Sequence, residues 1–210
     1  AITMKISHGL YFPNVNPEKC TNCLLCYKVC PGNYVDFQTL NSQIFGEQPN
    51  CSLIGSYFRC HIGHSVDGNI RQYSSSGGLI TQLLLFALEK GYIDGALVIR
   101  MSKNQPLVPE PFIARTRNEI CSASKSKYLP VPANVMLKEI LSRRGKFAVV
   151  GLPCHIQGIR KAEFHNEKLR NKIVLHLGLF CSHTVNFFGT EILLKKLNIA
   201  KQDVKQLTYR

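Results

Sequence analysis

The pattern of hydrophobic and polar positions divides the chain into two unlike parts. Residues 1–66 contain few periodic stretches and many Asn, Pro and Gly residues, which predicts a loop-rich segment. From Gln72 onward, short apolar segments of strand length alternate with segments in which apolar positions follow helical spacing. This alternation predicts an α/β domain with a mainly parallel sheet over residues 67–210, preceded by a small module over residues 1–66.

Strands and helices can be placed within the second part. Gly91 and Gly145 follow two of the helical segments where C-terminal caps belong, and Pro132 stands in the first turn of the segment that Gly145 follows. The predicted strands are residues 96–100, 112–115, 147–150 and 173–180. The predicted helices are residues 79–90, 132–144, 155–163 and 187–197.

Composition and charge narrow the class of protein. Of the 210 residues, 45% are hydrophobic and 19% are charged, which is typical of a globular domain and excludes a disordered chain. The net charge is +13, and residues 66–210 hold 22 of the 26 Lys and Arg residues. A field of this sign attracts phosphate-bearing cofactors, acidic partners or nucleic acid. Aromatic side chains are not interleaved with the basic ones, so nucleic acid is not the expected partner.

The absence of a targeting signal and the number of cysteines indicate where in the cell the protein is expected to reside. The sequence shows no secretory signal and no apolar run long enough for a membrane span. Nine cysteines in such a chain indicate metal or redox chemistry instead of disulfides, so we expect a cytoplasmic protein. Because the sequence starts at Ala1 and stops in mid-pattern, we also expect it to be the N-terminal fragment of a longer chain.

One cysteine motif indicates an iron–sulfur cluster. Its spacing, C-x2-C-x2-C-x3-C-P, is that of bacterial ferredoxins, in which the chain curls tightly to bring thiolates to three corners of a 4Fe-4S cube. Structural zinc prefers two separated C-x2-C pairs, so a cluster is favoured over zinc. In ferredoxins of this spacing the fourth Cys commonly binds a different cluster, which leaves Cys30 or the remote Cys60 as the fourth ligand. The motif consists of Cys20, Cys23, Cys26, Cys30 and Pro31.

Two further cysteines follow predicted strands. Cys154 lies past the strand at 147–150, and Cys181 lies past the strand at 173–180. In open α/β sheets, ligands bind outside the carboxyl ends of the strands, so both thiols can converge above the sheet in a second cluster or a flavin site. Two alternatives stay open: a pair of buried thiols, or a nucleophile formed by Cys154 and His155. Adjacent residues rarely face each other well enough for the latter.

A glycine-rich turn precedes the helix predicted at 79–90. Backbone N–H groups of Ser76, Gly77 and Gly78 can bind a phosphate there, aided by the helix dipole. The same residues also make an ordinary turn with a helix cap. Neither G-x-G-x-x-G nor G-x4-G-K-[ST] occurs, so neither a standard dinucleotide site nor a P-loop is indicated.

Taken in order, the motifs resemble the beta-subunit family of coenzyme F420 hydrogenases and dehydrogenases, which also includes 7-hydroxymethyl chlorophyll a reductase. The matching segments span nearly the whole chain. Besides the cysteine motif, they are the runs SGGLITQLL from Ser76, ALEKGYIDGA from Ala87, ART from Ala114, SKYLPVP from Ser126, GLPCHIQGIRK from Gly151 and LGLFC from Leu177.

The resemblance implies an iron–sulfur flavoprotein oxidoreductase. In this family FAD lies over the α/β sheet and exchanges a hydride with the deazaflavin coenzyme F420, while 4Fe-4S clusters carry single electrons. It also implies a redox partner, either a hydrogenase- or dehydrogenase-type subunit or a ferredoxin. Carried over to this sequence, the ligands of a second cluster are Cys154 and Cys181. The FAD-binding residues are Ser76, Gly77, Gly78, Thr81, Lys127, Tyr128, Pro153 and His155; no catalytic residue is assigned.

Two other functions stay open. An electron-transfer subunit with clusters but no substrate site of its own predicts iron and sulfide without FAD. A zinc-stabilised module associated with nucleic acid predicts zinc without acid-labile sulfide. The redox substrate is not determined by the sequence, because a ferredoxin, quinone-like or pigment substrate would leave the same residues in place.

Overall fold

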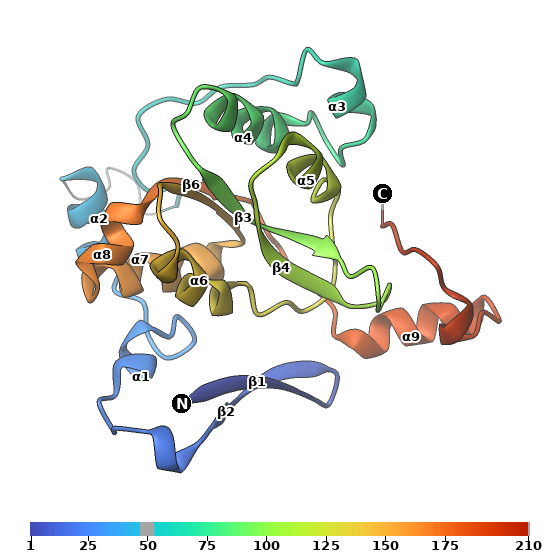
Figure 1. Cartoon of the computed structure of the whole chain (residues 1–210), viewed down its shortest axis with the longest axis horizontal. Helices are drawn as coiled ribbons and strands as arrows, with labels where there is room; N and C mark the ends of the chain where they lie inside the picture. Colours follow the sequence, from blue (N-terminus) through green and yellow to red (C-terminus); the bar gives the residue numbers. More distant parts are fainter. Residues whose placement is uncertain (47–52, 210) are drawn as a thin grey trace.

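A four-stranded sheet of order β4-β3-β5-β6 lies at the centre of the second part of the chain (Figure 1). The structure, a computed structural model, describes residues 1–46 and 53–209. Three strands are parallel and β4 pairs antiparallel with β3, which confirms the predicted α/β class and mainly parallel sheet. The strands are β3 (Gly95–Met101), β4 (Pro109–Ala114), β5 (Phe147–Gly151) and β6 (Ile173–Gly178).

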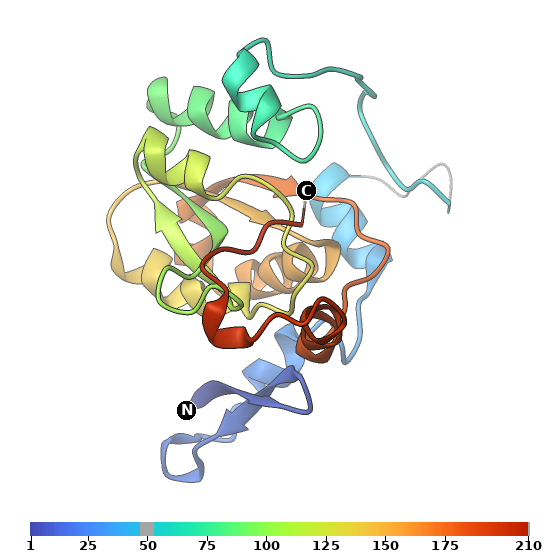
Figure 2. The same ribbon diagram turned by 90° about the vertical axis from the view of Figure 1, so that its right-hand side faces the viewer.

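Helices cover both faces of this sheet (Figures 1 and 2). On one face they pack in a core around Ala96, Val98 and Ala148, and on the other in a core around Leu97, Phe147 and Val149. Because successive strand residues point to opposite faces, a strand buries both sides only where consecutive residues are apolar, as they are throughout β5 and over residues 95–99 of β3. The first face carries α3 (Gly68–Gln72), α4 (Leu79–Glu89) and α5 (Arg117–Ser122). The second carries α6 (Leu137–Ser142), α7 (Pro153–Phe164) and α8 (Glu167–Lys172).

One predicted helix is divided in the structure. Residues 132–144 form the 3-10 helix η2 (Ala133–Met136), followed by α6. The Val135 N–H donates to the Pro132 carbonyl in the i to i+3 pattern of a 3-10 turn, and the Asn134 side chain donates to the His155 carbonyl on α7. These two hydrogen bonds hold the first turn tighter than an α-helix, so the prediction of one continuous helix is wrong.

A β-hairpin opens the chain. It consists of β1 (Ile2–Ser7) and β2 (Leu10–Val15), joined by His8 and Gly9, whose φ angles of 49° and 73° are those of a type I′ turn. The sequence interpretation missed this hairpin, although alternating residues flank a His-Gly pair. Three short helices follow, which are η1 (Pro17–Lys19), α1 (Leu25–Val29) and α2 (Phe37–Phe45).

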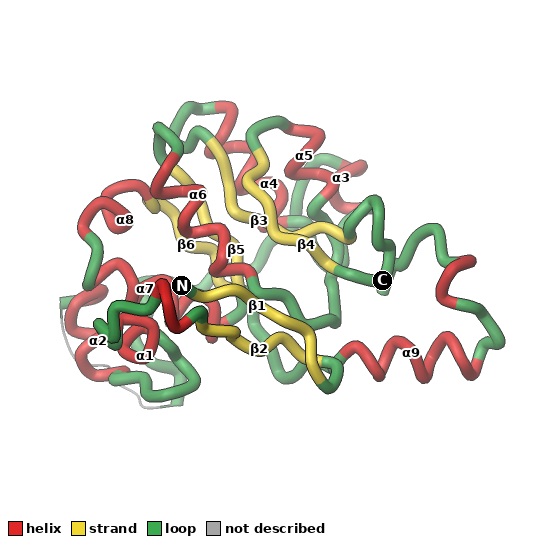
Figure 3. The backbone as a smooth tube through the Cα atoms, turned by 60° about the horizontal axis from the view of Figure 1, so that its bottom comes forward, coloured by secondary structure: helices red, strands yellow, loops and turns green. Residues whose placement is uncertain are grey.

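The turn end of the hairpin meets the first turn of the last long helix, α9 (Phe187–Lys196), which precedes η3 (Lys201–Asp203) (Figures 1 and 3). The Phe187 N–H donates to the Gly9 carbonyl at 2.9 Å, and the rings of Tyr11 and Phe187 meet edge to face with centroids 5.7 Å apart. The N-terminal segment is thus tied to a helix near the other end of the chain. No helix within residues 1–46 or 53–209 is long and apolar enough to cross a bilayer.

The predicted boundary at residue 66 stays a prediction. Ser65 is buried, and its hydroxyl donates to the Gln82 side chain on α4 at 2.8 Å. Its backbone N–H donates to the Gly77 carbonyl at 2.6 Å. The residues just before the boundary therefore already pack with the α/β domain.

Candidate functional site

The cysteine motif forms a curled loop around α1. Asn22 and Leu24 adopt left-handed conformations, with φ angles of 54° and 59°, and the chain leaves α1 at an extended Cys30. A left-handed Leu is sterically costly, so the loop holds a strained curl of the kind that thiolates spaced three residues apart need around one centre. The four thiols are free, and three of them are exposed; they belong to Cys20, Cys23, Cys26 and Cys30.

The electrostatics of this loop favour a thiolate. Hydrogen bonding from the Leu25 backbone lowers the pKa of the Cys23 thiol, with the Thr21 side chain and the positive charge of Lys28 adding to the effect. Thiolate is the form of cysteine that binds metals. Within residues 1–46 and 53–209, no three His, Cys, Asp or Glu side chains are grouped closely enough to hold a metal ion. The donor set and the curl fit a cluster, and the thiols have to turn toward a common centre to bind it.

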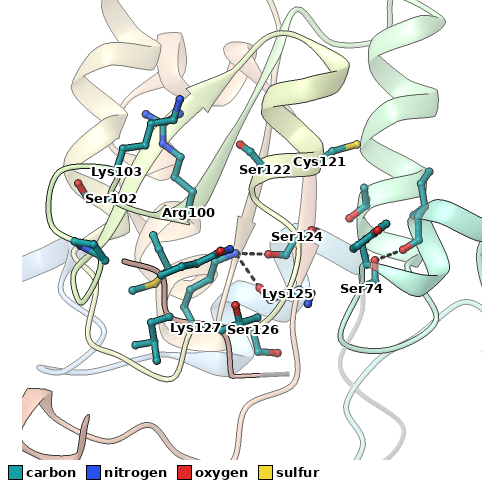
Figure 4. A pocket seen from close by; sticks show the side chains of 18 of the residues that line it. Ser74, Arg100, Ser102, Lys103, Cys121, Ser122, Ser124, Lys125, Ser126 and Lys127 are labelled. Atoms are coloured by element: carbon teal, nitrogen blue, oxygen red, sulfur yellow. Dashed lines mark hydrogen bonds between the residues drawn. The ribbon is translucent and has the colours of Figure 1, made fainter. Parts of the chain in front are cut away.

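A cavity of about 790 Å³ opens beyond the carboxyl end of β3 (Figure 4). Side chains from α3, α4, α5 and the loop after α5 line it, together with the last described residues of the chain. Asp67 is the acidic residue among those that line it, so the cavity is electropositive and suited to an anionic ligand. The basic residues are Arg100, Lys103, Arg117, Lys125, Lys127 and Lys205.

The arginines of the cavity are already engaged with carboxylates. Arg100 donates to Glu110 at 2.7 Å, and Arg117 contacts Glu89 at 2.8 Å and Asp67 at 3.1 Å. Among the residues that the structure describes, the lysines of the cavity form no ion pair with a carboxylate. Lys103, Lys125 and Lys205 are therefore the cations most available to a ligand, because Lys127 is engaged by its own loop.

Lys127 is held by the loop that carries it. Its ammonium donates to the carbonyl oxygens of Ala123, Ser124 and Lys125 at 2.6, 2.6 and 2.8 Å. An ammonium has three N–H donors, so all of them are used within the protein. Burial lowers the pKa of Lys127 to about 8, whereas the three carbonyls favour the protonated form. In this conformation Lys127 shapes the cavity wall and offers no donor to a phosphate.

The glycine turn before α4 packs against its own chain. A Cβ on Gly78, whose φ is +74°, would lie 3.0 Å from the Ile70 side chain, and one on Gly77 would lie 3.0 Å from the Gly63 carbonyl. The Ser75 hydroxyl accepts from the Ser126 backbone N–H at 2.7 Å, which fastens the turn to the Lys127 loop. These contacts explain both glycines without a ligand.

Some of the predicted flavin residues line the cavity and others do not. Thr81, on α4, lines the cavity as Lys127 does, whereas Ser76, Gly77 and Gly78 do not. Tyr128 meets Tyr209 edge to face with ring centroids 5.4 Å apart, outside the cavity lining. Of the predicted flavin residues, Thr81 and Lys127 line the cavity together, and the other six, including Pro153 and His155, are not among its lining residues.

Pro153 and His155 form the first turn of α7. The Leu152 N–H donates to Nδ1 of His155 at 3.4 Å, and the ring also hydrogen-bonds to the Val131 backbone. Burial, the larger effect, lowers the pKa of His155 despite the opposing bond to Val131. The ring is therefore neutral at pH 7 and serves the turn between β5 and α7.

Cys154 and Cys181 stand beyond the carboxyl ends of neighbouring parallel strands. Gly151 at the end of β5 pairs with Gly178 at the end of β6, and the Leu179 N–H donates to the Gly151 carbonyl at 2.9 Å. Both thiols are exposed at this edge of the sheet. The topology agrees with the expected placement, and their joint binding of a cluster stays a prediction.

Sequence reasoning missed a buried charged group between α7 and β6. Glu163 is 2% exposed and contacts Nε2 of His176 at 2.7 Å and the guanidinium of Arg160 at 3.2 Å. The signal was available, because Glu163 continues the helical spacing of Ile156 and Ile159, which pack in the core. A Glu on the apolar face of a helix indicates a buried partner.

Comparison with protein families gives three matches. Residues 13–33 match the 4Fe-4S binding domain. Residues 60–138 match the N-terminal part of the coenzyme F420 hydrogenase/dehydrogenase beta subunit, and residues 144–210 match its C-terminal part. The first match coincides with the curled loop, and the other two together cover all four strands of the sheet and its helices except most of α6.

Curated relatives and a solved structure agree with these matches. The chain is 35% identical to the coenzyme F420 hydrogenase subunit beta of Methanosarcina barkeri, over 61% of this chain and 45% of the relative. It is 31% identical to the subunit of the same name from Methanothermobacter thermautotrophicus, over 74% of this chain and 57% of the relative. A chain in the F420-reducing NiFe hydrogenase complex of M. barkeri superposes with a TM-score of 0.61 at 29% identity, covering 70% of this chain and 52% of that one. The chain thus spans about half the length of the curated relatives it matches.

Proposed function

The chain belongs to the coenzyme F420 hydrogenase/dehydrogenase beta-subunit family, and from this premise we propose that it is an oxidoreductase subunit passing electrons between a 4Fe-4S cluster and FAD. The FAD would exchange a hydride with a deazaflavin such as coenzyme F420. One observation carries the proposal: a 4Fe-4S motif and a cation-lined cavity at the carboxyl edge of a parallel sheet occur in the same chain.

The cysteine loop supplies the ligands for the first cofactor. Cys20, Cys23 and Cys26 would hold three corners of the cluster, with Cys30 or Cys60 at the fourth. A 4Fe-4S cluster carries one electron at a time, and a flavin links such transfers to a two-electron hydride. Hydrogen bonds to Cys23 favour the thiolate form that this binding needs.

The cavity supports a phosphate-bearing ligand. Its volume of about 790 Å³ lies within the range of cofactor sites, roughly 300 to 1,000 Å³. The side chains of Lys103, Lys125 and Lys205 line it and can bind phosphates as point charges. The glycine turn would not contact the phosphates itself. It would support their binding by holding α4 and the Lys127 loop in place. The same charges suit the pyrophosphate of FAD or the phosphate-bearing tail of a deazaflavin.

A partner subunit forms part of the proposal. The relatives are named as subunits of a hydrogenase, and the solved structure is a hydrogenase complex. This chain would accept or deliver electrons through its cluster to such a subunit, or to a ferredoxin.

Reconstitution tests the proposal. The chain is treated anaerobically with iron, sulfide and FAD, and bound iron, sulfide and flavin are then measured. We expect stoichiometric flavin, and we expect Lys103→Ala and Lys205→Ala each to weaken FAD binding by about one to two powers of ten, as for loss of a charge-assisted contact. The weakening should shrink as salt rises. Lys168→Ala, which removes an exposed lysine from α8, is the matched control and should leave FAD binding unchanged.

A second candidate is favoured by the position of the predicted flavin residues. Six of the eight do not border the cavity, which suits an electron-transfer subunit with a cluster and no flavin of its own. Iron and sulfide without FAD in the reconstituted chain would establish this candidate and reject the flavin. Zinc without sulfide would reject both.

A further inference from the structure

The cysteine loop rests on α7, far from it in the sequence (Figures 1 and 3). The Lys161 ammonium donates to the carbonyl oxygen of Cys30 at 3.0 Å and also to the carbonyl of Tyr34. Cys30 is the last cysteine of the motif, so Lys161 holds the peptide of a candidate cluster ligand. Its two acceptors fix the turn from Cys30 to Tyr34 against the helix.

Gly158, three residues earlier on α7, lets this turn approach. A Cβ at Gly158 would lie 3.4 Å from Cδ of Pro31 and 3.1 Å from the side-chain amide of Asn134. Residues three apart lie on the same face of a helix, so Gly158 and Lys161 make one continuous contact with the segment 30–34. The glycine supplies close approach, and the lysine supplies hydrogen bonds and charge.

The same helix begins at the edge of the sheet. α7 starts at Pro153, and Cys154 stands in its first turn. At a rise of 1.5 Å per residue, Lys161 is only about 10 Å along the helix axis from Cys154. α7 therefore sets a fixed separation between the cysteine loop and the carboxyl edge of β5 and β6.

We propose that Gly158 and Lys161 form the docking site for the Cys30–Tyr34 turn, and that Lys161 is a positioning residue that raises the reduction potential of the cluster. The effect of Lys161 on the reduction potential rests on the proposed function, because it requires the cluster to be bound. Reduction adds a negative charge to the cluster, and a nearby ammonium stabilises that added charge. Lys161 is half-buried, so solvent and salt screen this attraction less than they would at an exposed lysine.

The experiment compares three variants of the whole chain after anaerobic reconstitution with iron and sulfide. In Lys161→Met the four thiols remain, so we expect the cluster to form with a lower midpoint potential in a redox titration followed by electron paramagnetic resonance. The ratio of oxidised to reduced cluster at fixed potential should rise roughly two- to tenfold, tenfold being 59 mV for a one-electron couple. Lys161→Arg keeps the charge and should restore most of the potential. Lys168→Met removes the same charge from α8 and should change nothing. An unchanged potential in Lys161→Met would overturn the tuning role.

Docking is tested separately in the iron-free chain, so that failure of the cluster and failure of the docking site can be told apart. We expect thermolysin to cut within residues 1–46 several-fold faster in Lys161→Met and in Gly158→Val than in the wild type. Cleavage within the α/β domain should keep its wild-type rate in Lys161→Met, because Lys161 belongs to neither core. Gly158→Val also crowds the Asn134 side chain of the α/β domain at 3.1 Å, so a faster cut within that domain is expected in this variant alone. Equal cleavage of residues 1–46 in all chains would overturn the docking site. If the wild type bound no iron and sulfide, the proposed function and the tuning role would both fail, and this comparison would still decide the docking.

Discussion

Residues 1–46 and the sheet domain differ in what holds each of them in place. In residues 1–46, the buried residues are Gly9 and Leu40, and large apolar side chains such as Ile6 and Phe12 stay about half exposed. The sheet domain buries a core on each face, with Phe147 and Ala148 fully buried. Each buried large side chain contributes about 1.5–3 kcal/mol, so the sheet domain is stabilised by packing and the N-terminal segment is not.

The contrast shows that the N-terminal segment is held by a few contacts with the rest of the chain. They are the hydrogen bond and the ring contact that Phe187 makes with Gly9 and Tyr11, and the contacts of Lys161 and Gly158 with the segment 30–34. A cluster bound by several thiolates would add cross-links within this segment that its side chains cannot provide. Changes in the two regions should therefore have separable effects.

Cys23→Ala should have the largest effect, and this effect should be confined to the cluster and leave the sheet domain unchanged. It removes one of the closely spaced thiols, so we expect loss or marked lability of the N-terminal cluster after reconstitution, while the sheet domain keeps its thermal unfolding transition. Iron and sulfide assays and circular dichroism on the same sample measure both. Full iron content in this variant would show that the motif is not the cluster site.

Cys60→Ala is the matched control for that change. Cys60 is exposed and lies outside the motif. Wild-type iron content in this variant would leave Cys30 as the fourth ligand, whereas loss equal to that of Cys23→Ala would assign the fourth position to Cys60.

Two phenylalanines, one in each region, test how much side-chain packing contributes to the stability of that region. Phe147 is fully buried, whereas Phe12 on the hairpin is 47% exposed. We expect Phe147→Ala to lower the free energy of unfolding by about 3–5 kcal/mol, the usual cost of a cavity of that size, and Phe12→Ala by less than about 1 kcal/mol. Urea unfolding followed by circular dichroism measures both. Similar losses would mean that the hairpin belongs to the same cooperative core.

Two glycines within the sheet domain separate backbone strain from crowding. Gly78 and Gly91 both have left-handed φ angles, +74° and +69°, but a Cβ at Gly91 would meet nothing within 4 Å, whereas one at Gly78 would meet Ile70 at 3.0 Å. Gly91→Ala should cost about 1–2 kcal/mol from strain alone. Gly78→Ala should cost about 1–3 kcal/mol more, because overpacking is added. Equal melting temperatures for the two variants would show that the segment carrying Ile70 yields freely.

Lys127→Met should remove a dependence of stability on pH that the wild type shows between about pH 8 and pH 10.5. The pKa of Lys127 is lowered from 10.5 to about 8 by burial, so between these values the unfolded chain binds more protons than the folded one. Stability from this group therefore rises with pH across that window, by at most about 1.4 kcal/mol per pH unit, and the cost of burying the ammonium is fully present below pH 8. Urea unfolding at several values from pH 7 to pH 10 should show this slope in the wild type and not in the variant. Parallel curves for the two proteins would contradict the buried position.

The sequence predicted the elements whose pattern is set by burial. Helix α4 and strand β5 lie within a residue of the predicted bounds, because apolar spacing and flanking glycines report directly on packing. The hairpin at residues 2–15 was missed although apolar and polar residues alternate in its first strand, because its turn is His8-Gly9 and not the usual Asn-Gly or Asp-Gly. Residues 132–144 were misjudged because the break depends on Asn134 reaching the His155 carbonyl, a tertiary contact.

The candidate site was predictable only in its local parts. The cysteine spacing is a property of one short segment, and the family resemblance followed from motifs that are themselves local. The packing of Gly77 on residue 63 and the contact of Lys161 with Cys30 join residues that only folding brings together. The bonds of Lys127 to its own loop are local, but they depend on the conformation of that loop, which the spacing of residues does not specify. Charge and spacing alone could not distinguish these structural roles from ligand binding.

The contact between Lys161 and Cys30 also sets an order of events during synthesis. The two residues are 131 positions apart, so at about 5–20 residues per second the cysteine loop emerges from the ribosome roughly 7–26 s before its docking helix exists. The hairpin waits longer still, because its partner Phe187 is made later. During that interval the thiols of the nascent loop are accessible to whatever delivers iron and sulfide. Docking onto α7 then closes one side of the loop but leaves three of its four thiols exposed, so a cell could load iron both before and after α7 is made.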